Sequence, residues 1–176
     1  MVLRSHLPFA SMLAMLALPD GAAAASPVGY WKTIDDDSGK PTSIVQITEN
    51  GGKLSGRIVQ LIVQPGDEPD PVCIECEGNL KGKKVVGMQI LSGLEQDDDE
   101  WSGGRIMDPN NGKSYKCYIE VEDGGKKLKV RGYLGIALLG RTQYWQRVQK
   151  PDPNVRAVRL SDGKMTPIAW EKAPSP

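Results

Sequence analysis

The sequence predicts an all-β protein, built as an antiparallel up-and-down barrel of about eight strands. Three observations support this fold class. Residues 26–176 hold only four alanines but 19 glycines and 11 prolines, and a chain with so few good helix formers builds few helices. Apolar and polar residues alternate along several short stretches, which is the period of a half-buried strand. Finally, Asn50-Gly51, Asn111-Gly112 and Asp123-Gly124 separate such stretches, and these residue types accept the positive φ angles of tight hairpins.

The first 25 residues have the pattern of an export signal. Arg4 supplies a positive start, Leu7 to Leu18 is a mostly apolar run of twelve, and Ala22 to Ala25 offers the small residues that signal peptidase requires. We therefore expect a signal peptide at residues 1–25, cleaved near Ala24 or Ala25, and a periplasmic or secreted protein. An uncleaved amphipathic helix is the alternative. The apolar run is shorter than the roughly 20 residues that span a bilayer, so we expect no membrane span.

Charge and histidine content exclude several function classes. Lys plus Arg and Asp plus Glu both number 22, and this balance argues against a nucleic-acid partner, which needs a basic surface. The single histidine, His6, lies in the expected signal peptide. A Ser-His-Asp triad and a zinc site with histidine ligands are therefore excluded from the exported chain.

The barrel domain is expected at residues 26–149, with its strands in simple chain order. They are expected near Gly29–Ile34, Ser43–Thr48, Lys53–Val63, Lys84–Leu91, Glu100–Met107, Tyr115–Glu122, Leu128–Leu134 and Gly140–Val148. Alternation in the sixth and seventh strands turns one set of side chains inward, namely Tyr115, Cys117, Ile119, Val121, Leu128, Val130 and Leu134. Closure would remove exposed sheet edges, which favours a barrel. An open sandwich stays an alternative, because periodicity does not show closure.

Residues 150–176 form a C-terminal extension of different character. Lys150-Pro151-Asp152-Pro153 ends the barrel, because proline lacks the amide donor that a strand ladder needs. Val155–Leu160 and Met165–Trp170 flank a turn and form a candidate hairpin against the outside of the barrel. We expect the last four residues to lack a fixed structure.

The three cysteines predict a structural disulfide. In an oxidising compartment we expect Cys73 and Cys76 to bridge within a loop, with Cys117 as a buried thiol. A bridge from one loop cysteine to Cys117 is an alternative. Thiol redox catalysis is a further one, but Asp70 and Glu75 near the motif disfavour the thiolate that it needs. Zinc would lack a fourth ligand, so we expect neither a metal nor a cofactor.

Two acidic clusters, Asp35–Asp37 and Asp97–Glu100, are interpreted as solvated turns. Calcium loops place acids at fixed alternate positions and close with a glutamate, a spacing that these clusters lack. The many carboxylates leave glycosidase-like hydrolysis as a formal alternative, although no pair stands out.

Aromatic residues and arginines mark both ends of the barrel domain. Gly29-Tyr30-Trp31 opens the first strand, and Trp145-Gln146-Arg147 closes the eighth. In a closed meander these strands are neighbours, so Arg141 or Arg147 can cover the Trp31 ring by cation–π contact and plug one end. This arrangement resembles the lipocalin and fatty-acid-binding superfamily, whose first strand begins with Gly-x-Trp and whose last carries an arginine stacked on that tryptophan.

A closer resemblance covers about Gly29 to Val148. It rests on several motifs in order: the segment Gly29–Asp36, the Cys73-x-x-Cys76 loop, Trp101–Pro109 with Gly112–Tyr115, Val130–Gly135 and Gly140–Arg147. These resemble the family called domain of unknown function 2147, whose members are small secreted bacterial proteins. The resemblance implies a lipocalin-like fold and supplies no catalytic residues.

Three hypotheses of function follow. In the first, a non-enzymatic barrel binds a small amphiphilic ligand inside or at its mouth, with Tyr115, Ile119, Val121, Leu128 and Val130 facing inward and Arg131 and Tyr133 as binding residues or an external polar patch. In the second, exposed Trp101, Tyr118 and Trp170 contact an envelope protein. In the third, a carboxylate pair with separated pKa values performs hydrolysis.

Overall fold

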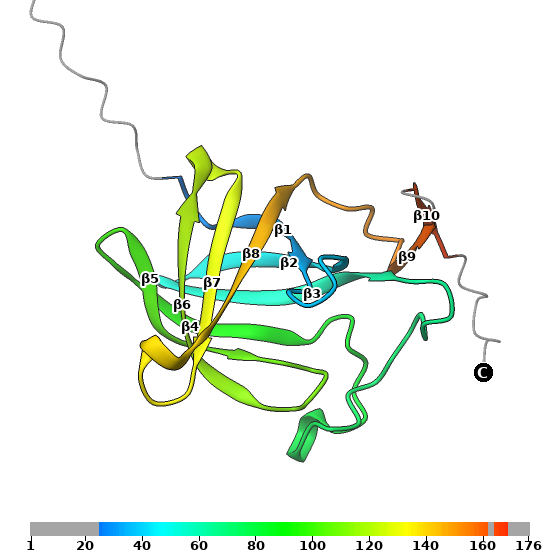
Figure 1. The fold of residues 1–176 in the computed structure, drawn as a ribbon, viewed down its shortest axis with the longest axis horizontal. Helices are drawn as coiled ribbons and strands as arrows, with labels where there is room; N and C mark the ends of the chain where they lie inside the picture. Colours follow the sequence, from blue (N-terminus) through cyan, green and yellow to red (C-terminus); the bar gives the residue numbers. More distant parts are fainter. Residues whose placement is uncertain (1–24, 162–163, 169–176) are drawn as a thin grey trace, which may run out of the picture.

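The computed structural model describes residues 25–161 and 164–168. In this part of the chain, ten strands and three short 3-10 helices follow one another as shown in Figure 1. The strands are β1 (Gly29–Ile34), β2 (Pro41–Asn50), β3 (Lys53–Val63), β4 (Gln89–Asp97), β5 (Glu100–Met107), β6 (Ser114–Glu122), β7 (Lys127–Tyr133), β8 (Arg141–Val148), β9 (Ala157–Ser161) and β10 (Lys164–Pro167). The 3-10 helices are η1 (Gly78–Leu80), η2 (Asp123–Gly125) and η3 (Ala137–Leu139). The all-β prediction is confirmed.

Eight strands close into a barrel. From β1 to β8 each strand pairs antiparallel with the next, and β1 pairs with β8 through Tyr30 with Val148 and Trp31 with Arg147. The earliest and last strands of the meander are therefore neighbours. Closure of the ladder confirms the barrel and excludes the open sandwich.

The structure places the fourth strand later than the alternation predicts. Val85 and Met88 are buried, but they lie in a turn in which the Met88 amide donates to the Val85 carbonyl. The strand runs from Gln89 to Asp97 instead of Lys84–Leu91. Gly93 has a φ of +71° and the pairing with β3 shifts register nearby. Such an irregularity interrupts the period-two pattern of a strand. The second half of β4 could therefore not be predicted from alternation.

The strand β3 changes partners along its length. From Lys53 to Arg57 it pairs with β4, and from Leu61 to Val63 it pairs in parallel with β9. β9 and β10 form an antiparallel hairpin, and Ala157 at its start is fully buried. The hairpin thus covers the part of β3 that lies beyond its pairing with β4 (Figure 1). β10 ends at Pro167, and Trp170 lies outside the described residues.

The main core lies inside the barrel and continues to Cys73, Cys76 and Met88 of the segment that joins β3 to β4. Its fully buried large side chains include both tryptophans of the paired first and last strands, together with Ile47, Leu54, Leu91, Leu94, Ile119 and Leu128. A smaller apolar cluster of Ile44, Ile62 and Val158 lies between the sheet and the C-terminal extension. Two open cavities lie at the end of the barrel where the long connections are, and we call this end the open mouth.

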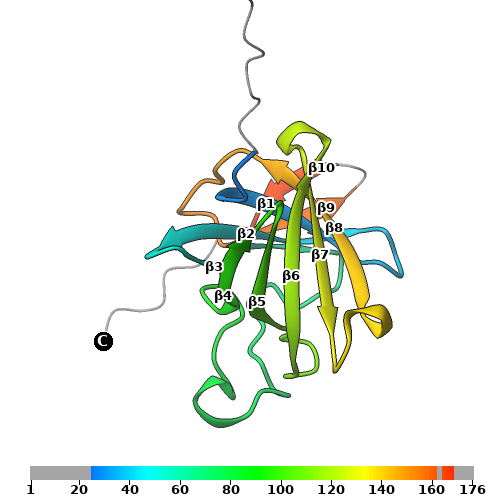
Figure 2. The ribbon, with the colours of Figure 1, turned by 90° about the vertical axis from the view of Figure 1, so that its left-hand side faces the viewer.

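The two ends of the barrel differ in construction, as Figure 2 shows. At the closed end lie the start of β1 and the turns β2–β3, β4–β5 and β6–β7. At the open mouth lie the connections 35–40, 64–88, 108–113 and 134–140. Because the strands alternate in direction, the long connections all fall on one side and the tight turns on the other. Long connections are where binding sites are usually built.

Candidate functional site

Two adjoining cavities form the open mouth. The smaller has a volume of about 290 Å³ and lies between the β5–β6 and β7–β8 connections. The larger, of about 770 Å³, extends towards β1, β2, β3 and the loop 64–88. Both are lined by Ile106, Asp108, Arg141 and Gln143. These four residues therefore form the boundary between the two cavities.

The smaller cavity exists because the inward face of β7 loses its side chains towards the mouth. Along that face Leu128 and Val130 are 0% and 2% exposed, and the next position is Gly132. A Cβ at Gly132 would lie 3.2 Å from Ile106 Cγ2 and 3.7 Å from Tyr115 Cβ. The lining thus changes from packed aliphatic side chains to a stretch of bare backbone that Ile106 approaches closely.

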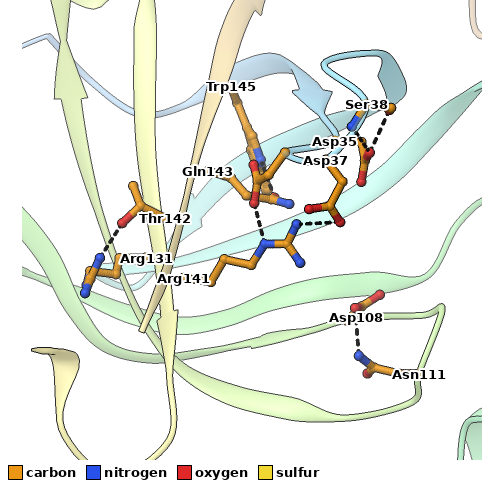
Figure 3. A network of polar contacts seen from close by, with 11 residues as sticks. Asp35, Asp37, Ser38, Asp108, Asn111, Arg131, Arg141, Thr142, Gln143 and Trp145 are labelled. Carbon is orange, nitrogen blue, oxygen red and sulfur yellow. Dashed lines mark hydrogen bonds and ion pairs between the residues drawn. The ribbon is translucent and has the colours of Figure 1, made fainter. Parts of the chain in front are cut away.

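Arg141 is anchored at the rim of the mouth by two aspartates. Its Nε donates to Asp36 Oδ2 at 2.5 Å, and its Nη2 donates to Asp37 Oδ2 at 3.2 Å (Figure 3). The hydrogen bond to Asp36 and then that to Asp37 raise the pKa of Arg141, so the guanidinium stays charged. The pairs join the β1–β2 connection to the start of the neighbouring strand β8.

The amide of Gln143 is oriented by a buried tryptophan. Trp145 is 1% exposed, and its Nε1 donates to Gln143 Oε1 at 3.1 Å (Figure 3). Because an amide oxygen accepts this bond, the Gln143 amide nitrogen is left with two hydrogens to donate. Gln143 lines both cavities, so it offers donors to a molecule held there.

Three hydroxyl groups line the wall of the larger cavity. Thr33 Oγ1 lies 2.8 Å from both Thr42 Oγ1 and Ser43 Oγ, and it accepts the Ser43 backbone amide at 3.0 Å. A hydroxyl oxygen has two acceptor sites, so Thr33 can accept only one further hydrogen. Either the Thr42 or the Ser43 hydroxyl hydrogen is therefore left without an acceptor inside this trio. This hydroxyl group adds another hydrogen-bond donor to the cavity wall.

Carboxylates dominate the charge of the larger cavity. Six acidic residues line it, and Arg141 is the single basic residue in that lining. The six are Asp35, Asp37, Asp67, Glu68, Glu75 and Asp108. Such a rim repels anions and admits neutral or cationic groups.

The acidic side chains at the mouth also stabilise their own loops. Asp35 Oδ1 accepts the Ser38 amide at 2.8 Å and its hydroxyl at 2.6 Å, and these bonds lower the pKa of Asp35. The Asp108 oxygens accept the Asn110 amide and the Asn111 side chain, each at 2.9 Å (Figure 3). Both carboxylates thus have structural bonding partners within their turns.

Glu100 and Asp35, whose pKa values are shifted in opposite directions, lie at opposite ends of the barrel. Burial, followed by the nearby charges of Asp97 and Glu120, raises the pKa of Glu100. Glu100 lies at the start of β5 at the closed end, whereas Asp35, whose pKa is lowered, lies at the open mouth. A hydrolase needs its two carboxyls on either side of one bond, and these two are at opposite ends of the barrel.

Arg147 covers Trp31 at the closed end. Its guanidinium carbon lies 4.1 Å from the centre of the Trp31 ring. It also donates to the carbonyl oxygens of Gly125, Val28 and Ser26, and burial lowers its pKa. Arg141, the other candidate for this position, lies at the open mouth instead. The register Trp31 with Arg147 decides between them.

The residues predicted as binding residues lie in three places, and Val130 belongs to both the core and the smaller cavity. Ile119, Leu128 and Val130 are buried in the core, and Val121 is half-buried against it. Tyr115, Val130 and Tyr133 line the smaller cavity. The Arg131 side chain donates hydrogen bonds to backbone carbonyl oxygens of the β7–β8 loop. Leu134 does not join the buried inward row that the alternation predicts, because it lies beyond the end of β7, where it is 66% exposed at the edge of the smaller cavity.

The two described rings of the proposed protein-contact surface do not form one patch. Trp101 is paired with Ile119 in the ladder and packs against the core. Tyr118, the neighbour of Ile119 in β6, points to the opposite face, where Lys129 lies over its ring at 5.5 Å. Trp170 lies outside the described residues.

The predicted disulfide between Cys73 and Cys76 is confirmed. It lies in the loop 64–88, and Glu75 in the same turn packs against Gly112, where an added Cβ would lie 2.1 Å from the Glu75 carbonyl oxygen. The disulfide loop therefore rests on the β5–β6 connection. Cys117 is a buried free thiol, and burial raises its pKa to about 12, which opposes thiolate chemistry at neutral pH.

Comparison with known proteins decides the family. The family described as "Uncharacterized protein conserved in bacteria (DUF2147)" matches residues 29–147. The chain belongs to the DUF2147 family. The match runs from the start of β1 to Arg147, which covers Trp31 and lies one residue before the end of β8.

A solved structure supports the fold of this DUF2147 protein. The matching structure is described as "Protein HP1028 from the human pathogen Helicobacter pylori belongs to the lipocalin family". The two chains are 20% identical with a TM-score of 0.61, and the match covers 71% of this chain and 84% of the other. At this identity the likeness shows a lipocalin-like fold.

Sequence reasoning missed most of the polar groups at the mouth. Asp36 and Asp37 were interpretable only as a solvated turn, and Gln143 carried no signal apart from its place in the last strand. Among the described residues, no group of three or more His, Cys, Asp and Glu side chains is placed to hold a metal ion. The described part of the chain contains no helix long and apolar enough to cross a bilayer.

Proposed function

We propose that this DUF2147 protein binds a small, partly apolar ligand at the open mouth of its barrel. The observation that carries the proposal is the pair of adjoining cavities, of about 290 Å³ and 770 Å³, above a packed core. Small-molecule sites usually measure about 300–1,000 Å³ and combine apolar walls with a few polar groups. The mouth has this composition.

The lining indicates the chemistry of the ligand. Ile106, Val130 and Leu139 supply apolar wall in the smaller cavity. The Gln143 amide and the hydroxyl trio supply hydrogen-bond donors, while the carboxylates around the larger cavity repel negative charge. The ligand class that fits is an amphiphile with an aliphatic part and a head group that carries acceptor oxygens and no negative charge.

Fluorescence titration tests this proposal. An uncharged phenylnaphthylamine probe, which fluoresces strongly when it leaves water, should bind and should then be displaced by monododecanoylglycerol. Dodecanoate, which has the same chain but a negative charge at neutral pH, should displace the probe about tenfold less well, equivalent to about 1.4 kcal/mol. Equal displacement by both compounds would contradict the role of the carboxylate rim.

A pair of matched variants locates the site. Gly132→Leu places a side chain into the smaller cavity beside Ile106, and it should weaken probe binding about tenfold or more. Gln146→Leu adds the same side chain to the exposed position of β8 that pairs with Lys127, and it should leave binding unchanged. Equal probe binding by the wild type and Gly132→Leu would contradict a binding site at the mouth.

We further propose that the protein acts outside the cytoplasm. The proposal rests on the charged start, apolar run and alanine cluster of residues 1–25, and a bridged Cys73–Cys76 pair fits an oxidising compartment. N-terminal sequencing of the protein from a bacterial periplasmic extract tests it. A mature chain that begins at Ala25 or Ser26 is expected, and a chain that retains Met1 would contradict export.

A further inference from the structure

The β7–β8 loop exposes four large aliphatic side chains beside the mouth. Leu134, Ile136, Leu138 and Leu139 are 66%, 61%, 82% and 77% exposed. The segment 134–140 contains no polar or charged side chain. In both views the loop projects at the open end of the barrel (Figures 1 and 2). Apolar exposure gathered in this way marks an interaction surface rather than scattered surface residues.

Arg131 holds the backbone of this loop in place. Its Nε donates to the Ala137 carbonyl at 2.8 Å and its Nη2 to the Leu138 carbonyl at 3.2 Å. Within the loop, the Leu139 amide donates to Ile136 and the Gly140 amide to Ala137. The carbonyl groups at the tip are thus hydrogen-bonded from within the protein. Backbone that enters hydrocarbon needs internal partners of this kind.

We propose that the β7–β8 loop docks the protein on a lipid bilayer by inserting the side chains of Ile136 and Leu138. Stable protein interfaces bury about 800 Å² on each partner and rely on aromatic and arginine anchors. One short loop with only aliphatic side chains, glycine and alanine offers neither. Insertion of side chains into hydrocarbon requires apolar area, which the loop offers, and it is favoured where the nearby carbonyl groups are already hydrogen-bonded, as those of Ile136, Ala137 and Leu138 are.

A second loop places an exposed aliphatic side chain at the same end. Ile74 is 69% exposed in the loop 64–88 and lines the larger cavity. Leu134 and Leu139 likewise line the smaller cavity. The cavities therefore open beside the docking loop, so that docking would bring the mouth close to the bilayer.

The charge of the mouth predicts which bilayers are bound. The four connections at the mouth carry nine acidic residues against five lysines, so with Arg141 their net charge is −3 and gives no net attraction to anionic lipid. Apolar insertion therefore supplies the affinity. Binding should therefore occur on neutral phosphatidylcholine vesicles and should change little when salt rises from about 0.1 to about 0.5 M, a range that screens ionic attraction.

Co-sedimentation with phosphatidylcholine vesicles tests the proposal. The double variant Ile136→Asp with Leu138→Asp should bind vesicles about tenfold less than wild type, because charged side chains resist insertion. Neither residue lines a cavity, so probe binding at the mouth should stay unchanged and the two proposals fail separately. Met165→Asp, at a position 54% exposed on β10, is the matched control and should bind like wild type. The wild type and both variants must begin at the same residue, so that any difference in vesicle binding comes from the substitutions alone.

Three results would overturn the proposal. One is vesicle binding by the double variant equal to that of wild type, with both proteins folded by circular dichroism. Another is binding that requires anionic lipid and disappears at high salt. The third is concentration-dependent dimerisation that the same substitutions abolish, without vesicle binding, which would assign the loop to a second copy of the chain.

Discussion

Arg147 offers a direct test of how the barrel is closed. Replacement by alanine removes its contact with the Trp31 ring, 4.1 Å from the guanidinium carbon, and its hydrogen bonds to three backbone carbonyls. A partly desolvated cation–π contact contributes about 1–2 kcal/mol. A hydrogen bond from a charged donor contributes about 1.5–3 kcal/mol when it is sheltered, which applies to Gly125, whereas the Val28 and Ser26 carbonyls return to water. We therefore expect Arg147→Ala to lower the free energy of unfolding by about 3 kcal/mol, a large part of the about 5–15 kcal/mol of a typical domain.

Arg141→Ala is the matched control in the same strand. Arg141 makes ion pairs with Asp36 and Asp37, but its side chain is 59% exposed, and exposed pairs contribute about 0–1 kcal/mol. Urea denaturation followed by tryptophan fluorescence measures both variants. With a slope of about 2 kcal/mol per molar urea, the midpoint should fall by about 1.5 M for Arg147→Ala and by less than about 0.5 M for Arg141→Ala. Similar midpoint shifts for the two variants would refute the assignment of Arg147 as the plug.

Further predictions concern the core and the closed end. Cys117, whose pKa burial raises to about 12, should not react with a thiol reagent at about pH 8 until the protein is unfolded, and rapid labelling of the native protein would contradict its burial. Glu100→Gln should raise the urea midpoint at neutral pH but not near pH 3. The raised pKa of Glu100 means that its ionisation favours the unfolded chain as pH rises, and the glutamine cannot ionise. An unchanged midpoint at neutral pH would contradict the raised pKa. Gly104→Ala should destabilise the barrel by at least about 2 kcal/mol, since the added Cβ would lie 2.6 Å from the Ser92 carbonyl oxygen, and a variant with the wild-type midpoint would show that this backbone can move.

Much of the barrel could be predicted from the sequence because its signals are local. The alternation from Tyr115 to Glu122 lies in one strand, and the Asp123-Gly124 turn follows it directly. The position of Trp31 after a glycine at the start of the first strand also carried information, since closure brings it to the last strand. The fourth strand was the exception, because Val85 and Met88 are buried in a turn and Gly93 interrupts the alternation.

The mouth could not be predicted because its contacts join distant parts of the chain. The bond from Arg141 to Asp36 spans 105 residues, and no local pattern marks these two residues as partners of each other. Whether Arg141 or Arg147 covers Trp31 depends on the register of β1 with β8, which alternation does not fix. The donor role of Gln143 likewise depends on Trp145 occupying its carbonyl oxygen.

The NMR signals of the indole Nε1–H groups of Trp145 and Trp31 offer the most direct test of ligand binding at the mouth. Trp145 Nε1 donates to Gln143 at the cavity, whereas Trp31 Nε1 donates to Pro27 at the closed end. In a nitrogen–proton NMR titration with monododecanoylglycerol, the Trp145 signal should shift and saturate while the Trp31 signal stays in place. Movement of the Trp31 signal alone, or of neither signal at saturating lipid, would contradict a binding site at the open mouth.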